Sequence, residues 1–181
     1  METETKVKAD QSLFNEFVEA GVNADTAVSV PLPQTDIVNR RPITRELVFE
    51  AEHYIAQLPS VDMPVTHHFS KGVYARELFI PKGTILTGKI HKYENLNIMI
   101  SGELSVSTDE GIKRVKAPFI VVSPPGTKRI AYAHEDTRWI TIHGTEEKDV
   151  DVIERIFIAQ TEQEYLTFVD EQKLLEEKKG D

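Results

Sequence analysis

The feature that most constrains this chain is a series of short apolar segments separated by turns rich in Gly and Pro. Each segment carries the β-branched and aromatic residues typical of strands. The segments cover residues 64–69, 72–80, 84–91, 95–101, 103–108, 112–116, 118–123, 128–134 and 137–143. Strands this short, with such frequent turns, predict a mainly β sandwich or barrel.

Helical periodicity flanks this region on both sides. A first helix is expected after Asp10 and ends at Gly21, and residues 22–42 contain three prolines and predict an extended arm. Thr44 begins a second amphipathic helix, which Pro59 stops. Such a helix is best explained as the cover of one face of the barrel.

Two further helices are predicted after the last strand. One has an apolar face within residues 150–157, and the other begins at Thr161, where Glu164 completes a capping box. The chain therefore divides into N-terminal helices and arm (1–60), a β-barrel (61–145) and C-terminal helices packing on the barrel (146–181).

Composition narrows the classes of partner. A net charge of −9 over 181 residues disfavours a nucleic-acid surface, which needs clustered Lys and Arg. The absence of cysteine excludes disulfides, thiolate nucleophiles and Cys-based zinc sites. No apolar run resembles a signal peptide or reaches transmembrane length, so we expect a soluble cytoplasmic protein with no membrane partner.

Two segments resemble the conserved motifs of the cupin superfamily. The first cupin motif runs Gly, five residues, His-x-His, three or four residues, Glu, six residues, Gly. Here Gly83, Lys89, His91, Asn95 and Gly102 stand at those spacings. The second motif contains Pro-x-Gly followed by His, and residues 124–129 match its core with Arg in place of His. The resemblance covers residues 60–145 and implies a cupin-type double-stranded β-helix, that is, a jelly-roll barrel with flanking helices.

A narrower resemblance is to small cupin-like proteins encoded by tailed bacteriophages. It implies a phage-encoded protein working in the host cytoplasm, and gives no mechanism. The matching strings are His67-His68-Phe69, Leu86-Thr87-Gly88-Lys89-Ile90-His91-Lys92, Leu96-Asn97-Ile98, Ser123-Pro124-Pro125-Gly126-Thr127-Lys128-Arg129 and Ala133-His134-Glu135-Asp136-Thr137.

The resemblance also implies where a cupin metal would be bound. The usual ligands are three His and one Glu, and the corresponding positions are Lys89, His91, Asn95 and Arg129. Only His91 is a standard ligand, and the two cations would oppose a divalent ion. We therefore expect no cofactor, and a divalent metal at His91 is disfavoured.

The altered positions favour an anion instead. Strand alternation would place Lys89 with His91 on one face, and Asn95 with Asn97 on the inner face of the next strand. With Arg129 facing the same interior, this set suits a small anionic ligand such as a nucleotide-like, sugar-phosphate or carboxylate compound.

Two further residues complete the predicted ligand-binding set. His134 lies in a turn near one rim of the barrel, and Glu77 is an acid placed to pair with the cations. A metal set of His91, His134 and Glu77 is an alternative that depends on the folding of that turn. His143 ends the last strand and has no predicted partner. Equally open is a barrel without a ligand, in which Glu77 and Glu94 neutralise the cations.

Three functions follow from these readings. The first is a small-molecule-binding protein that captures an anionic ligand. The second is an isomerase or lyase that works without metal, with His91 as general base and Lys89 or Arg129 stabilising negative charge. The third is a virion-associated structural oligomer built through the N-terminal arm. The resemblance to cupins implies a homodimer, and the sequence does not decide whether the protein is an enzyme.

Overall fold

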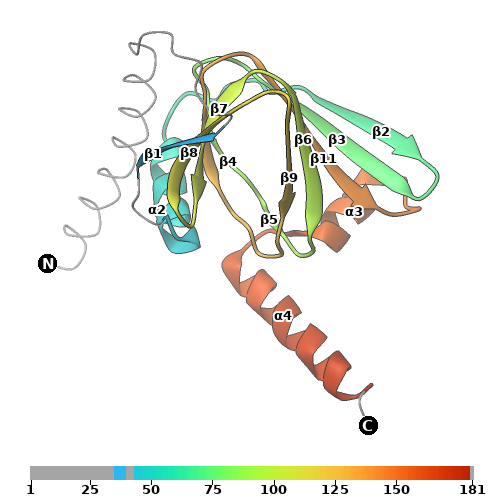
Figure 1. Cartoon of the computed structure of the whole chain (residues 1–181). Coiled ribbons are helices and arrows are strands. Elements are labelled where there is room, and N and C mark those ends of the chain that lie inside the picture. The colour runs from blue at the N-terminus through green and yellow to red at the C-terminus, as the bar shows by residue number, and fades with distance from the viewer. Residues whose placement is uncertain (1–34, 40–42, 180–181) are drawn as a thin grey trace, which may run out of the picture.

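Two antiparallel sheets face each other and form the body of the protein (Figure 1). The computed structural model describes residues 35–39 and 43–179. The first sheet has the order β1-β8-β7-β10-β4 and the second has the order β2-β3-β11-β6-β9. The first sheet contains β1 (Thr35–Asn39), β4 (Ile85–Thr87), β7 (Glu103–Thr108), β8 (Gly111–Lys116) and β10 (Ile130–Ala133). The second contains β2 (Val65–Ser70), β3 (Val73–Ile80), β6 (Asn95–Ser101), β9 (Phe119–Ser123) and β11 (Thr137–Gly144).

The strand pairing is nested. In chain order, β3 pairs with β11, β4 with β10, β6 with β9, and β7 with β8. Each strand of the first half therefore finds its partner at the mirrored position of the second half, which is the arrangement of an eight-stranded jelly roll. The predicted mainly β jelly roll with flanking helices is confirmed. The predicted segment 84–91 is broken into β4 and β5 (Ile90–His91).

The N-terminal arm is described only over β1. This strand pairs with β8 and so extends the edge of the first sheet. The helix predicted over residues 10–21 and the remainder of the arm lie outside the described residues.

Helix α2 (Arg45–Ile55) covers the outer face of the first sheet. Thr44 caps it, because its side chain accepts a hydrogen bond from the Leu47 amide. Val48 and Ala51 are buried against side chains of the sheet such as Ile130. The helix ends at Ile55, before Pro59 is reached. The predicted amphipathic helix therefore forms and covers the barrel as expected.

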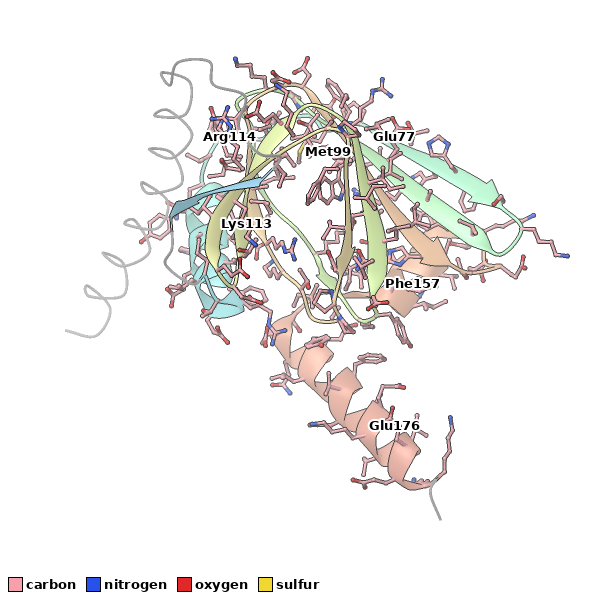
Figure 2. All side chains as sticks on the ribbon, viewed as in Figure 1. Glu77, Met99, Lys113, Arg114, Phe157 and Glu176 are labelled. Atoms are coloured by element: carbon pink, nitrogen blue, oxygen red, sulfur yellow. The ribbon has the colours of Figure 1, made fainter. Side chains whose placement is uncertain are left out.

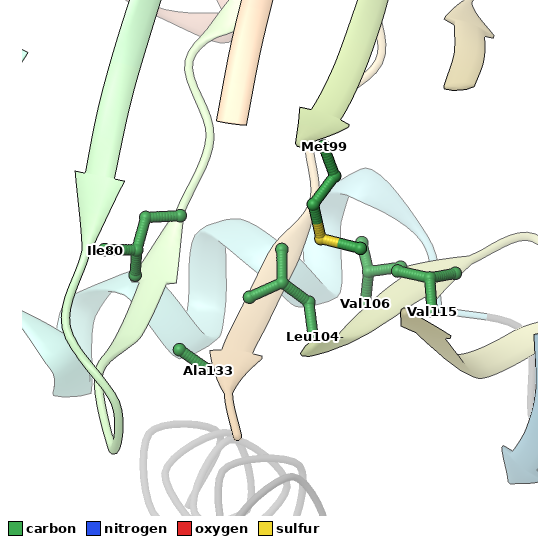
Figure 3. Close-up of a cluster of buried hydrophobic side chains, with 6 residues drawn as sticks. All are labelled: Ile80, Met99, Leu104, Val106, Val115 and Ala133. Carbon is green, nitrogen blue, oxygen red and sulfur yellow. The ribbon is translucent and has the colours of Figure 1, made fainter. Parts of the chain in front are cut away.

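An apolar cluster fills one end of the space between the sheets (Figure 3). Its side chains come from both sheets, because alternate residues of every strand point inward. Met99 is fully buried at its centre. The cluster consists of Ile80, Met99, Leu104, Val106, Val115 and Ala133. Polar side chains replace the apolar ones toward the other end.

The C-terminal region closes that other end. Helix α3 (Val150–Phe157) is followed by β12 (Ile158–Ala159), which pairs with β5, and by α4 (Glu162–Glu177). In α4 the Tyr165 side chain is buried, whereas Leu174 and Leu175 are 55% and 50% exposed. The later turns of α4 extend away from the sheets (Figure 1). Within the described residues, no helix has the length and apolar content needed to cross a bilayer.

Two turn glycines give a test of the strand connections. Both have positive φ, at +92° for Gly102 and +80° for Gly83. A Cβ on Gly102 would lie 2.6 Å from the Thr137 Cα and 2.7 Å from the Asp136 carbonyl oxygen, whereas a Cβ on Gly83 meets nothing within 4 Å. We expect Gly102→Ala to lower the free energy of unfolding by about 3 kcal/mol or more, and Gly83→Ala by about 1 kcal/mol. Urea unfolding measures both, and equal losses would contradict this account of the β6–β7 turn.

Candidate functional site

The inner face of the second sheet changes from apolar to polar along its strands. Near the apolar cluster, the inward residues of β3 and β11 are Leu78 and Trp139, which pair across the strands. The next inward pair is Arg76 with Thr141. In this half, the inward polar residues of β3, β6, β9 and β11 are Tyr74, Arg76, Asn95, Asn97, Ser123, Thr141 and His143. They lie at the end of the barrel that α3 closes.

The two asparagines form a closed hydrogen-bond network. The Asn97 amide nitrogen donates to Asn95 Oδ1 (2.7 Å) and to Ser123 Oγ (3.1 Å). The Asn97 Oδ1 accepts from Trp139 Nε1 (3.1 Å) and Thr141 Oγ1 (2.8 Å). Both asparagines are 4% exposed. They lie on one inner face, as predicted, but the amide of Asn97 is already satisfied within the protein and ties three strands together.

Two histidines come together beside this network. The His91 ring stacks on that of His143 at 5.3 Å between centroids. The His143 ring stacks at 4.4 Å on Phe157 of α3, which is labelled in Figure 2. Burial, together with the nearby charges of His143, Arg76 and Lys89, lowers the pKa of His91 to about 4. Burial alone lowers the pKa of His143 to about 4. Both rings are therefore neutral at pH 7.

Two arginines, Arg76 and Arg129, lie on the inner faces of the two sheets. Arg76 alternates with Tyr74 on β3, and burial lowers the pKa of its guanidinium. Arg129 precedes Ala131, which packs in the apolar cluster, and its carbonyl accepts from the Gly88 amide. Burial also lowers the pKa of Arg129. Within the described part of the chain, neither guanidinium forms an ion pair or a side-chain hydrogen bond.

Different charges lie near the two arginines. Arg76 acts electrostatically on both His91 and Lys89, whereas the charge that acts on Arg129 is that of Asp109, in the β7–β8 turn. His91 lies near Arg76 and His143, and Lys89 does not join the expected convergence of residues 89, 91, 95 and 129. The convergence of Arg129 on His91 stays a prediction.

Lys89 differs from its predicted position. Its side chain is 54% exposed and forms an ion pair with Glu154 of α3. The strand is interrupted between β4 and β5, so the alternation that was expected to align Lys89 with His91 does not apply there. The predicted salt bridges of Lys89 and Arg129 with Glu77 and Glu94 do not form.

Glu77 and His134 lie away from His91. Glu77 is on the outer face of the second sheet, because it neighbours the inward Arg76, and it pairs with Arg138 (2.6 Å) and His68 (2.9 Å) (Figure 2). His134 follows an inward alanine, so it is buried on the outer face of the first sheet with its Nε2 2.8 Å from Ser105 Oγ. Among the described residues, no group of three or more His, Asp or Glu side chains is placed to hold a metal ion. The alternative metal set of His91, His134 and Glu77 is therefore not assembled.

Sequence reasoning missed Arg76 and His143. A signal for Arg76 was present, because a cation alternates there with Tyr74 and Leu78 on an otherwise inward-facing pattern. His143 carried no such signal. Its partners, His91 and Phe157, lie far from it in the sequence and reach it only through the packing of β5 and α3.

Among solved structures, cupin proteins resemble this chain at low sequence identity. No protein-family model and no curated protein matches the sequence. A cupin-2 domain of an XRE-family transcriptional regulator from Enterobacter cloacae is 13% identical and has a TM-score of 0.40, with 47% of this chain and 98% of that chain covered. An RmlC-like cupin family protein from Methanocaldococcus jannaschii is 17% identical, with a TM-score of 0.39 and coverage of 50% and 86%. KdgF from a Halomonas species is also 17% identical, with a TM-score of 0.39 and coverage of 49% and 81%. The assignment of a jelly roll stands on the strand pairing itself.

The histidine pair predicts a specific dependence of stability on pH. The folded pKa values of about 4 lie below the ordinary value of 6.5, so the unfolded chain binds more protons between these limits. The contribution of the two neutral rings to the free energy of unfolding is therefore fully present above pH 6.5. It falls as the pH drops toward 4, by on the order of 3 kcal/mol for each histidine. His91→Gln and His143→Gln should each flatten the slope between pH 7 and 5, measured by urea unfolding. The exposed His53, changed to Gln, is the control, and an unchanged slope in both site variants would contradict the assignment.

Proposed function

We propose that this protein binds a small anionic ligand through the guanidinium of Arg76, on the inner face of the second sheet. The observation that supports this is the partly buried guanidinium, which has no carboxylate partner within the described residues. Leaving a cation desolvated and unpaired costs several kcal/mol, whereas a bound anion offsets that cost. The anion class predicted from the sequence is retained, and Arg76, which was not in the predicted set, becomes its main contact.

The surroundings of Arg76 favour a carboxylate or phosphate group. A guanidinium offers a planar pair of donors that matches both groups. The neutral ring of His91 can donate one hydrogen bond to such an oxygen. Lys89 lies at the solvent-exposed edge of this group of residues. The pKa values of both Lys89 and His91 are lowered in part by the charge of Arg76. This mutual repulsion would be relieved by a negative ligand, which should also raise the pKa of His91.

The same geometry supports binding better than catalysis. A general base is most effective when its pKa lies near the working pH. A pKa of about 4 makes His91 a weak base at neutral pH, and no carboxylate of the described residues acts on it to raise that value. The isomerase or lyase alternative therefore receives no support from the site. The phage-encoded setting stays a prediction from the sequence strings.

The proposal can be tested with anions of defined chemistry. We expect phosphate or citrate, compared with chloride at equal ionic strength, to raise the Tm of the full chain. Arg76→Gln should weaken that binding about tenfold to a hundredfold, because a charge-assisted bidentate contact is lost. It should not lower the Tm in chloride, since it removes an unpaired cation. Arg138→Gln is the matched control, because Arg138 pairs with Glu77 on the outer face of the same sheet.

A direct search for the ligand accompanies this test. Native mass spectrometry of freshly purified protein, with elemental analysis, reports a co-purified small molecule and any bound metal in one measurement. Isothermal titration in two buffers of different ionisation enthalpy reports whether His91 takes up a proton when an anion binds. The proposal fails if no anion shifts the Tm, or if Arg76→Gln and Arg138→Gln have equal effects.

A further inference from the structure

The outer face of the second sheet carries a continuous layer of aliphatic side chains. The outward residues of β6, β9 and β11 line up in rows across the strands, so that Ile140 faces Ile98 and Ile98 faces Ile120. Several are open to solvent, with Ile120 64%, Val122 52% and Ile100 49% exposed. The layer consists of Leu96, Ile98, Ile100, Ile120, Val122, Ile140 and Ile142. We call it the aliphatic face.

This pattern is not that of a sheet with one face in water. Such a sheet normally alternates apolar residues inside with polar residues outside. In β9 the run Phe119-Ile120-Val121-Val122 is apolar on both faces, and strands of that kind are covered on both sides in folded assemblies. Among the described elements, α2 packs on the first sheet and α3 and α4 contact β12. None of them buries the aliphatic face.

We propose that the aliphatic face is covered by the same face of a second copy of the chain, related by a two-fold axis. The area supports this occupant. The three strands that carry the aliphatic face, β11, β6 and β9, together with the adjoining β3, are about 4.8 Å apart and about seven residues long, so they cover roughly 450 Å² in projection. The relief of the side chains raises the accessible area toward the roughly 800 Å² that each partner buries in a standard interface. A flat sheet face also packs on its own copy as the two sheets of a sandwich do.

The distribution of charge also favours the aliphatic face as the contact between two copies. Each chain carries a net charge of −9, so two copies repel one another over most of their surface. The outward residues of β6, β9 and β11 include no carboxylate, and Arg138 is the charged group on β11 beside them. Arg138, Glu77 and His68 stand at the β2–β3 side and form a polar rim. An apolar centre with a polar rim is the ordinary anatomy of an interface.

The first test measures mass in solution. Light scattering or sedimentation of the full chain at micromolar concentration should give twice the chain mass of 20.5 kDa. Ile120→Lys should give a single-chain mass with an unchanged circular dichroism spectrum, because the residue is 64% exposed within one chain and buried only in the dimer. Leu174→Lys is the control, since Leu174 is 55% exposed on α4, and it should stay dimeric. A wild-type mass of one chain, or a dimeric Ile120→Lys, would overturn the proposal.

A second test locates the contact. The chain has no cysteine, so a single introduced cysteine reports only contacts between copies. Ile98→Cys, at the centre of the aliphatic face, should form a cross-linked dimer with a short bis-maleimide at least about tenfold faster than Leu174→Cys, which is the range expected when two groups are held together. Equal rates would show that a dimer forms elsewhere. A monomer whose aliphatic face fails to bind a hydrophobic dye would show that another part of the same chain covers it, and this too would overturn the proposal.

Discussion

Alternation along the strands of the second sheet decides where each chemical group of this protein lies. On β3 the inward Arg76 stands next to the outward Glu77, and on β6 the inward Asn97 stands next to the outward Ile98. Because register is fixed by pairing on both sides of β11, a slip of one residue would expose the asparagine network and bury isoleucines among polar groups. The polar inner face and the aliphatic outer face of this sheet therefore depend on the same strand register.

The buried network around Asn97 reinforces that constraint. Its amide joins β6 to β9 through Ser123 and to β11 through Thr141. In a shifted register the Asn97 amide would be buried without these partners, and its lost hydration would not be compensated. The network therefore lowers the free energy of the native register relative to any shifted one. It also explains why polar residues can occupy half of the barrel interior without requiring a ligand of their own. The groups outside the network, chiefly Arg76, His91 and His143, are the ones that can contact a ligand.

The fold could be read from the sequence because each of its signals is local. Turn glycines such as Gly102, cap residues such as Thr44 and Thr161, and the apolar period of two each act within a few residues. The site could only be read in part, because it depends on contacts between distant segments. Lys89 is not on its predicted face, because it lies in the break between β4 and β5. Arg76 is a candidate site residue because the fold places no acid of the described residues against it. Neither fact is encoded in the spacing of the cupin-like motifs.

The distribution of charge separates the proposed site from the proposed interface. The chain is acidic overall, yet its interior cations, Arg76 and Arg129, form no ion pair within the described residues, although the charge of Asp109 acts on Arg129. A local positive field inside an acidic protein attracts small anions, which can reach it, and excludes large polyanions, which meet the acidic surface first. The aliphatic face lacks carboxylates and so is where two acidic chains can meet. Covering it would hold β6, β9 and β11 from outside while the Asn97 network holds them from inside, which fixes the strands beside Arg76.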